Sequence, residues 1–421
     1  MLKGSGPGVW HGGPMETTAP EPASAGSAPA FHGIPLRVHR APVRCLDTAA
    51  LTAVELQLRG AEDSAFAAPG VLRATARSMG ETGLLDEFTL AAARAYAEEE
   101  SAVPQLALLD VEIAVSANLA GVDDGVRLIA TVTEDAVMAH PARALGRIAA
   151  ARSMGVAIAV DEVGERPQSL ALLSLVEPDV IITSADLVSR PAHALTARAA
   201  HAVAAYRERT DALVIARGVD SDLQRRRALG VGARFGIGSF PPATAASVAG
   251  HGDFDPGPRS RPGGASDGRS TPFTIAAPGR RTTRSLKRLL VSMSKMLEMQ
   301  AASAGQDTIV LGTFQHADHF TPGSRRRWAH LASQVAYTGI YGVGIQPMID
   351  FNVHHAPLDH TDRLVDEWNV VVLGSHFCCV LAARDLHKGT VDSEREFEYV
   401  VSYDRRTVTR CAHAVLERFT D

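Results

Sequence analysis

The chain has 421 residues, of which 46% are hydrophobic and 21% charged, and it carries a formal net charge of −5 with an isoelectric point near 6.3. This composition is ordinary for a soluble globular protein, and the small negative charge argues against a general nucleic-acid binder. The four cysteines include the neighbours Cys378 and Cys379, which are poor material for a disulfide framework, and no apolar run reaches the roughly 18 residues of a membrane helix. The sequence therefore predicts a cytoplasmic, reducing location.

Two segments rich in Gly, Pro, Ala and Ser divide the chain. Residues 1–33 have little apolar sequence with which to build a core and no secretory pattern, so we expect a disordered tail. Residues 251–272 have the composition of a linker. Two folded domains are therefore expected, over residues 34–250 and 273–421.

The first expected domain alternates short apolar runs with amphipathic, helix-like segments. The strand-like runs cover residues 52–58, 106–113, 126–132, 156–160, 179–183, 212–216 and 233–240. Alternating strands and helices predict a mostly parallel sheet that is buried on both faces. About seven or eight such units fit a TIM-like (β/α)8 barrel. The alternative is an open, doubly wound sheet, for which no G-x-G-x-x-G motif gives support.

The second expected domain also mixes helices and strands. We expect strands at residues 307–314, 339–345, 368–375 and 397–404, and helices at residues 282–305, 325–338, 377–387 and 405–421. This pattern predicts a separate α/β domain whose strand order the sequence leaves open.

Polar side chains stand at the carboxyl ends of the expected barrel strands, where barrel enzymes carry their chemistry. These positions form a candidate ligand-binding set at the barrel mouth: Glu55, Arg59, Asp110, Glu134, Asp161 and Arg217.

Five segments in the same order resemble the EAL family of cyclic-di-GMP phosphodiesterases. They are VELQLRG (54–60), FAAPGVLRATARSMGETGLL (66–85), IATVTE (129–134), AVDEVGERPQSLALLSLVEPDVI (159–181) and IARGVDSDLQRRRALGVGARFGIGSFPP (215–242). The resemblance spans about 200 residues, and it implies an EAL-type barrel.

The resemblance also implies which catalytic groups are missing. EAL phosphodiesterases hold two divalent metals through carboxylates and one Asn, and a Lys and a Glu help to activate water. Glu55 and Asp161 match metal positions, and Asp110 stands at the Asn. The second acid of the family's Asp pair is Glu162, and the remaining positions hold residues of another type: Thr131, Ile182, Ser184, Arg217 and Ile237. We therefore expect no catalytic residues, no bound metal and no hydrolysis.

The C-terminal half resembles the DICT sensory domain. The matching segments are IVLGTFQHADHFTPGSRRRWAHLA (309–332), YGVG (341–344), DRLVDEWNVVVLGSHFCCVLAARD (362–385) and EFEYVVSYDRRTV (396–408). The family occurs beside diguanylate-cyclase, EAL and two-component modules, which implies a sensory role, light responses included. Candidate ligand or chromophore contacts are Trp368, His376, Cys378 and Cys379. The histidines at positions 316, 319, 354, 355, 360 and 376 match no zinc spacing and are expected in loops.

These observations predict a non-enzymatic signalling regulator that requires no cofactor. Its expected partners are weakly bound cyclic-di-GMP or an unknown small molecule or chromophore, together with a signalling protein. Neither a membrane nor direct nucleic-acid contact is expected, and a homodimer is possible. Two alternatives stay open: a residual phosphodiesterase, and a protein-interaction module that docks a kinase or a transcription factor.

Overall fold

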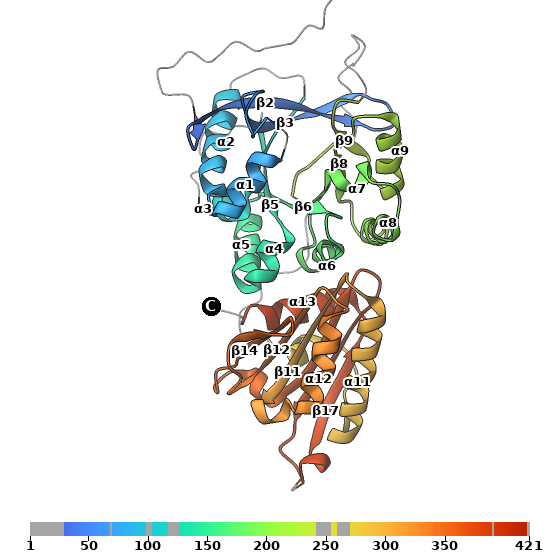
Figure 1. The fold of residues 1–421 in the computed structure, drawn as a ribbon. Coiled ribbons are helices and arrows are strands. Elements are labelled where there is room, and N and C mark those ends of the chain that lie inside the picture. Colours follow the sequence, from blue (N-terminus) through green and yellow to red (C-terminus); the bar gives the residue numbers. More distant parts are fainter. Residues whose placement is uncertain are drawn as a thin grey trace, which may run out of the picture.

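The computed structural model describes residues 29–67, 70–97, 103–116, 126–240, 254–258, 270–389 and 391–418. These residues form two units, each built around its own sheet and stacked one on the other (Figure 1). Most of the expected tail and linker lies outside the described residues. None of the described helices combines the length and the apolar character needed to cross a bilayer.

The first unit is a closed barrel, which confirms the TIM-like fold and makes the open-sheet alternative wrong. Strands β2 to β9 pair in chain order, and β2 also pairs with β9 to close the sheet. A short strand, β1, extends β2. The strands are β1 (Ala30–Phe31), β2 (Ile34–Cys45), β3 (Leu51–Gly60), β4 (Gln105–Asp110), β5 (Val126–Val132), β6 (Ala157–Val163), β7 (Val180–Thr183), β8 (Leu213–Arg217) and β9 (Phe235–Ile237).

Strand β2 is the element that the sequence pattern missed. It runs antiparallel to both β3 and β9, whereas the strands from β3 to β9 pair in parallel. Its residues, IPLRVHRAPVRC, place positive charges among the apolar ones and include Pro42. A proline and interspersed charges weaken the alternation by which a strand is normally found, so the closing strand of the barrel was absent from the expected set.

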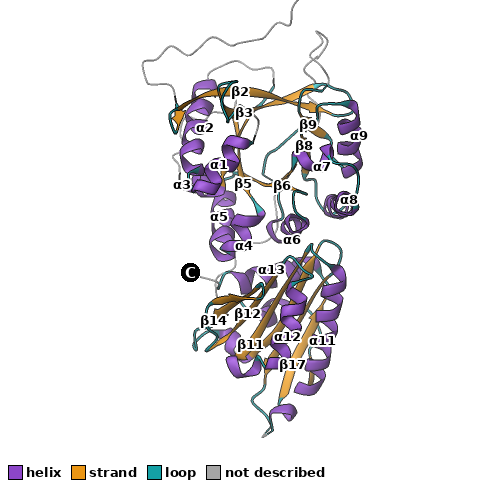
Figure 2. Cartoon of the chain, in the orientation of Figure 1, coloured by secondary structure: helices purple, strands orange, loops and turns teal. Residues whose placement is uncertain are grey.

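Helices surround the barrel, as shown in Figure 2. They are α1 (Val71–Met79), α2 (Thr82–Ala97), α3 (Val111–Ser116), α4 (Glu134–Ala139), α5 (Pro141–Ser153), α6 (Ala171–Val176), α7 (Ala185–Ser189), α8 (Ala194–Arg207) and α9 (Asp222–Val231), with a 3-10 turn at Pro167–Leu170. Side chains alternate along each strand between the barrel interior and this helical layer. In β8, for example, Ile215 packs inside the barrel, and Val214 and Ala216 pack outward.

The second unit is a mixed eight-stranded sheet with the order β10-β17-β16-β15-β11-β12-β14-β13. Strand β12 pairs in parallel with β11 and β14, and the other pairings are antiparallel. The strands are β10 (Thr283–Leu286), β11 (Thr308–His316), β12 (Tyr337–Val343), β13 (Met348–Asp350), β14 (Val353–Pro357), β15 (Glu367–Gly374), β16 (Cys378–Asp385) and β17 (Glu396–Ser402). The helices are α10 (Pro272–Ala276), α11 (Lys287–Ala304), α12 (Pro322–Ala332) and α13 (Arg405–Leu416), with 3-10 turns at Ala317–His319, Arg363–Asp366 and Asp392–Glu394.

Several expectations for this unit were wrong. Residues 283–286, which belong to the helix expected at 282–305, form strand β10, and the helix α11 begins only at Lys287. Residues 377–387 were expected to be helical, but they contain the central strand β16. Leu and Ala favour helices, and a run that is buried on both faces has no period by which a strand and a helix can be told apart. His316 ends strand β11, and His354 and His355 lie in strand β14, whereas loops were expected at all three positions.

Helices cover both faces of this sheet. Val370 and Val372 of β15 pack with α11 and α12, whereas Val371 and Leu373 point to the face that α13 covers. The core on the α13 face continues into the barrel through helix α6, all six residues of which are buried. The two units therefore share one hydrophobic core.

Polar contacts reinforce this shared core at α6. Arg405 of α13 donates from Nη1 to Ser174 Oγ at 3.0 Å and to the carbonyl oxygen of Gly374 at 2.6 Å. The Nε2 atom of His413 lies 2.7 Å from the carbonyl oxygen of Leu175. The end of α6 is thus bonded to the helix that covers the second sheet.

Candidate functional site

A cavity of about 920 Å³ opens at the mouth of the barrel. Four of the six residues predicted for this site line it: Glu55, Arg59, Asp161 and Arg217. Glu55, Asp161 and Arg217 each stand two positions after an interior residue of the same strand, namely Ala53, Ala159 and Ile215. Residues two apart in a strand share a face, so these three side chains point into the barrel.

Arg217 forms the centre of the site. Its guanidinium donates from Nη2 to Glu55 Oε1 at 3.0 Å and from Nη1 to Glu55 Oε2 at 3.1 Å, which is the bidentate geometry of a strong charge-assisted pair. Its Nε atom lies 3.6 Å from Asp161 Oδ1. Burial alone would lower the pKa of Arg217, but the charges of Glu55 and Asp161 raise it above its usual value. The guanidinium thus neutralises both acids.

A short hydrogen-bonded row continues from this pair along β3. Gln57 Nε2 donates to Glu55 Oε2 at 3.0 Å, and Arg59 Nη2 donates to Gln57 Oε1 at 3.0 Å. These residues are two apart in the strand and therefore share one face. Burial lowers the pKa of Arg59, and the negative charge of Glu55 opposes this shift. Unlike Arg217, Arg59 contacts the amide of Gln57 and no carboxylate among the described contacts. Its guanidinium therefore remains a cationic group at the cavity wall.

The other two predicted residues lie apart from the cavity lining. Asp110 Oδ1 accepts from the backbone nitrogen of Glu112 at 2.9 Å, and burial raises the pKa of this carboxyl, with the nearby Asp86 adding to the shift. Glu134 pairs with Arg166 at 2.8 Å, and burial raises its pKa as well, while Arg166 opposes the shift. The six candidates therefore do not form a single constellation.

The sequence did not reveal the partner of Glu162. This residue lies within a register shift of β6, between Val160 and Val163, and adopts a φ of 59°, which is uncommon for a residue other than glycine. Its carboxylate accepts two hydrogen bonds from Arg77 Nη1 of helix α1, at 2.9 and 2.8 Å. Glu162 is thus bonded to a residue of helix α1 that lies 85 positions away in sequence.

The donor set does not fit two divalent metals. Glu55 and Asp161 are committed to Arg217, and Thr131 Oγ1 donates to the carbonyl oxygen of Leu109 at 3.0 Å. Ile182 and Ile237 belong to the apolar cluster inside the barrel. Across the described part of the chain, no three His, Cys, Asp or Glu side chains converge as metal ligands. Hard cations need several converging oxygens, and this site does not offer them while Arg217 is paired with both acids.

The four candidates in the second unit are divided between two ends of the sheet. Cys378 and Cys379 begin β16, and burial raises the pKa of Cys379 to about 12, so that its thiol stays protonated near neutral pH. The His376 ring lies 6.4 Å from the ring of His201 in the barrel. Cys378 pairs with Leu373 near the end of β15, whereas Trp368 lies near the start of that strand. The five positions that separate Trp368 from Leu373 correspond to roughly 17 Å in an extended strand.

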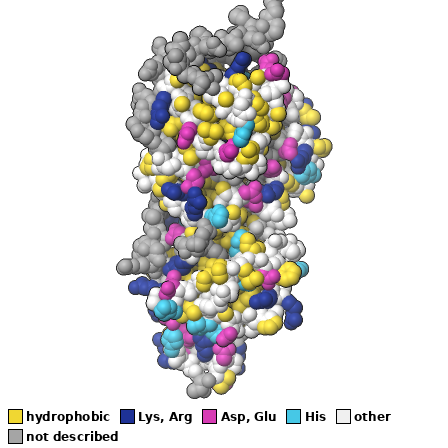
Figure 3. Space-filling model, turned by 60° about the vertical axis from the view of Figure 1, so that its left-hand side comes forward, with side chains coloured by type: hydrophobic (Ala, Val, Ile, Leu, Met, Phe, Trp, Pro, Cys, Tyr) yellow, Lys and Arg dark blue, Asp and Glu magenta, His cyan; other side chains and the backbone are white. Residues whose placement is uncertain are grey.

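Charged side chains of both signs are mixed on the face of the molecule that Figure 3 draws. Figure 3 shows Lys and Arg interspersed with Asp and Glu over the visible face.

Family comparisons agree with this architecture. The model for "EAL domain" matches residues 30–241, and the DICT model, described as "Sensory domain in DIguanylate Cyclases and Two-component system", matches residues 273–386. A search of curated proteins found no match for this chain.

Several solved structures resemble the barrel half. The PaMucR phosphodiesterase in a c-di-GMP complex is 20% identical, with a TM-score of 0.38 over 48% of this chain and 93% of its own. Klebsiella pneumoniae BlrP1 in a calcium and cy-diGMP complex is 19% identical, with a TM-score of 0.41 over 49% of this chain and 55% of its own. The Xanthomonas citri FimX EAL domain in complex with c-diGMP is 18% identical, with a TM-score of 0.38 over 49% and 86%. Because the EAL model covers 212 of the 421 residues, the chain is a member of the EAL domain family that also carries a DICT sensory domain.

Proposed function

We propose that this chain is a non-enzymatic regulator in cyclic-di-GMP-linked signalling, in which the EAL barrel is a scaffold and the DICT domain senses or docks. One observation carries the proposal. The guanidinium of Arg217 supplies the positive charge between Glu55 and Asp161 that a divalent cation would otherwise supply. A fixed internal cation needs no metal, and it repels one.

Two further residues support the loss of hydrolysis. Ile182 is 1% exposed inside the barrel, and a hydrocarbon side chain can neither give nor take a proton. Thr131 is hydrogen-bonded to the backbone of β4 and offers no carboxylate. The barrel therefore lacks a side chain that could activate water at position 182 and a carboxylate that could bind a metal at position 131.

We expect the purified full-length chain to release no linear product from cyclic-di-GMP with either Mg²⁺ or Mn²⁺. The physical reason is that the site holds a guanidinium in place of a cation and an isoleucine in place of a proton carrier. The measurement is the amount of linear product, followed over time by chromatography. Turnover that disappears in Glu55→Ala would establish the residual phosphodiesterase instead.

We expect cyclic-di-GMP itself to bind more weakly than about 10 μM, or roughly 7 kcal/mol of binding free energy. Arg59 offers one phosphate contact, but Arg217 is already bonded to two acids and Ile237 offers no polar group to a guanine edge. Isothermal titration calorimetry with and without Ca²⁺ measures this. A submicromolar complex that Arg59→Ala abolishes would make the barrel a receptor.

The DICT domain is the proposed input. Helix α6 of the barrel is buried between the two domains, and its end is bonded to α13 of the DICT domain. A conformational change in the DICT domain would therefore reach the barrel through this contact. The docking of a signalling protein, a homodimer and a cytoplasmic location remain predictions from the sequence.

A further inference from the structure

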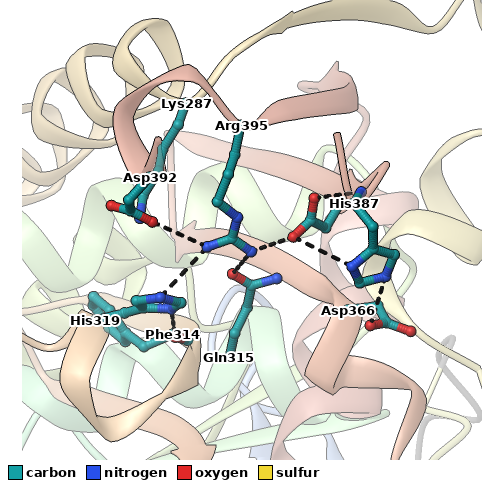
Figure 4. Close-up of polar contacts among 9 residues, drawn as sticks. Lys287, Phe314, Gln315, His319, Asp366, His387, Asp392 and Arg395 are labelled. Atoms are coloured by element: carbon teal, nitrogen blue, oxygen red, sulfur yellow. Dashed lines mark hydrogen bonds and ion pairs between the residues drawn. The ribbon is translucent and has the colours of Figure 1, made fainter. Parts of the chain in front are cut away.

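A polar cluster lies at one end of the DICT sheet, at the start of α11. Figure 4 shows Arg395 between two groups of side chains, with Asp392 and His319 on one side and Gln315 and His387 on the other. Arg395 Nη1 lies 3.3 Å from Asp392 Oδ1, and its Nη2 lies 3.0 Å from Gln315 Oε1. A second carboxylate, that of Asp385, accepts from Nη2 as well.

Lys287 is an unusual residue for its position in this cluster. It is the first residue of the 18-residue helix α11 and is only 9% exposed. The amino end of a helix carries a partial positive charge, so a buried ammonium there is unfavourable without an anion. Asp392 supplies the anion: Lys287 Nζ lies 2.6 Å from both of its carboxylate oxygens. The Nζ atom also lies 5.8 Å from the ring centroid of Trp368.

The two acids beside Arg395 differ in how firmly they are held. The Asp385 side chain is 1% exposed, and it belongs to the end of strand β16. The Asp392 side chain is 64% exposed, and it belongs to a three-residue 3-10 turn between β16 and β17. The exposed Asp392 carboxylate can leave its two cations without losing buried packing, whereas Asp385 is enclosed. Asp392 is therefore the acid that a competing anion can displace.

His319 holds Arg395 in place. Burial and the charge of Lys287 lower the pKa of His319, so its ring is neutral near pH 7. A neutral ring that donates from Nδ1 to the carbonyl oxygen of Phe314, at 3.0 Å, leaves Nε2 to accept from Arg395 Nη1 at 3.4 Å. The guanidinium is thus oriented with Nη1 on the side of Lys287 and Asp392.

We propose that Lys287 and Arg395 form an anion-binding site in the DICT domain, and that Asp392 fills this site as an internal ligand. The ligand that displaces Asp392 carries a carboxylate or a phosphate group, because these anions accept from an ammonium and a guanidinium together. This site lies outside the barrel, and it goes beyond the proposed function, since it does not depend on whether the barrel hydrolyses or binds nucleotide.

The test uses the full-length chain and two probes, inorganic phosphate and acetate, titrated by calorimetry at constant ionic strength. Asp392→Asn removes the internal anion and keeps the shape of the side chain. We expect it to bind at least one probe about ten-fold more tightly than the wild type, which corresponds to about 1.4 kcal/mol. The probe that gains more identifies the phosphate or the carboxylate as the preferred group.

Asp359→Asn is the matched control, because Asp359 is an equally exposed acid of the same domain that contacts His360 and Thr361. The gain in probe affinity should be absent in Asp359→Asn. It should also be lost in the double variant Asp392→Asn, Lys287→Met, whose folding is checked by near-ultraviolet circular dichroism. An equal affinity in wild type and Asp392→Asn, or an equal gain in Asp359→Asn, overturns the proposal. If the double variant does not fold, the comparison of the two single variants decides.

Discussion

Replacing Arg217 with alanine should lower the free energy of unfolding by about 3–5 kcal/mol, because it leaves two acids in the barrel without their counter-charge. Glu55 is 4% exposed and Asp161 is 7% exposed, so water compensates little of the loss. Chemical denaturation at neutral pH measures the effect. Arg226→Ala serves as the control, because Arg226 forms a surface ion pair with Asp222 at 3.2 Å and should cost at most about 1 kcal/mol.

The same variant should respond to divalent cations. With the guanidinium gone, Mn²⁺ can bind between Glu55 and Asp161, and a cation that binds only the folded state stabilises it by about 2.7 kcal/mol at 100 times its Kd. We therefore expect Mn²⁺ to raise the Tm of Arg217→Ala and to leave that of the wild type unchanged. Equal stability of the two proteins, or the same shift with Mn²⁺, would show that Arg217 does not stand in for a cation.

Replacing Arg405 with methionine should separate the unfolding of the two domains. Arg405 donates to Ser174 of the barrel and to the backbone of Gly374 and Ser375 in the DICT domain. Each hydrogen bond to a charged group contributes about 1.5–3 kcal/mol, and methionine keeps most of the apolar volume. We expect a lower first transition in differential scanning calorimetry and two resolved transitions in place of one.

Arg410 provides the control for this variant. It lies on the same helix, α13, and is exposed. Arg410→Met should leave the calorimetric trace within about 0.5 kcal/mol of the wild type, as is usual for surface substitutions. If Arg405→Met also melts in one unchanged transition, the bonds at α6 do not couple the domains.

Much of the fold could be predicted from local sequence. The barrel strands β3 to β9 are short, apolar and separated by helical segments, so each was visible as an element of its own. Several strands were not predicted correctly, among them β2, β10, β13, β14 and β16. Charges and two prolines interrupt the pattern of β2, and burial on both faces removes the period of β16.

The candidate site divides in the same way. Sequence alone determined which groups are present: the arginine at position 217, the isoleucines at 182 and 237, and the acids at 55 and 161. Only the tertiary structure decided how these groups pair. Arg217 reaches Glu55 across 162 positions of the chain, and Glu162 turns instead to Arg77. Such pairing depends on the closure of the barrel, which brings the carboxyl ends of β3, β6 and β8 to one mouth. The strength of each pair then follows from burial, which local sequence does not encode.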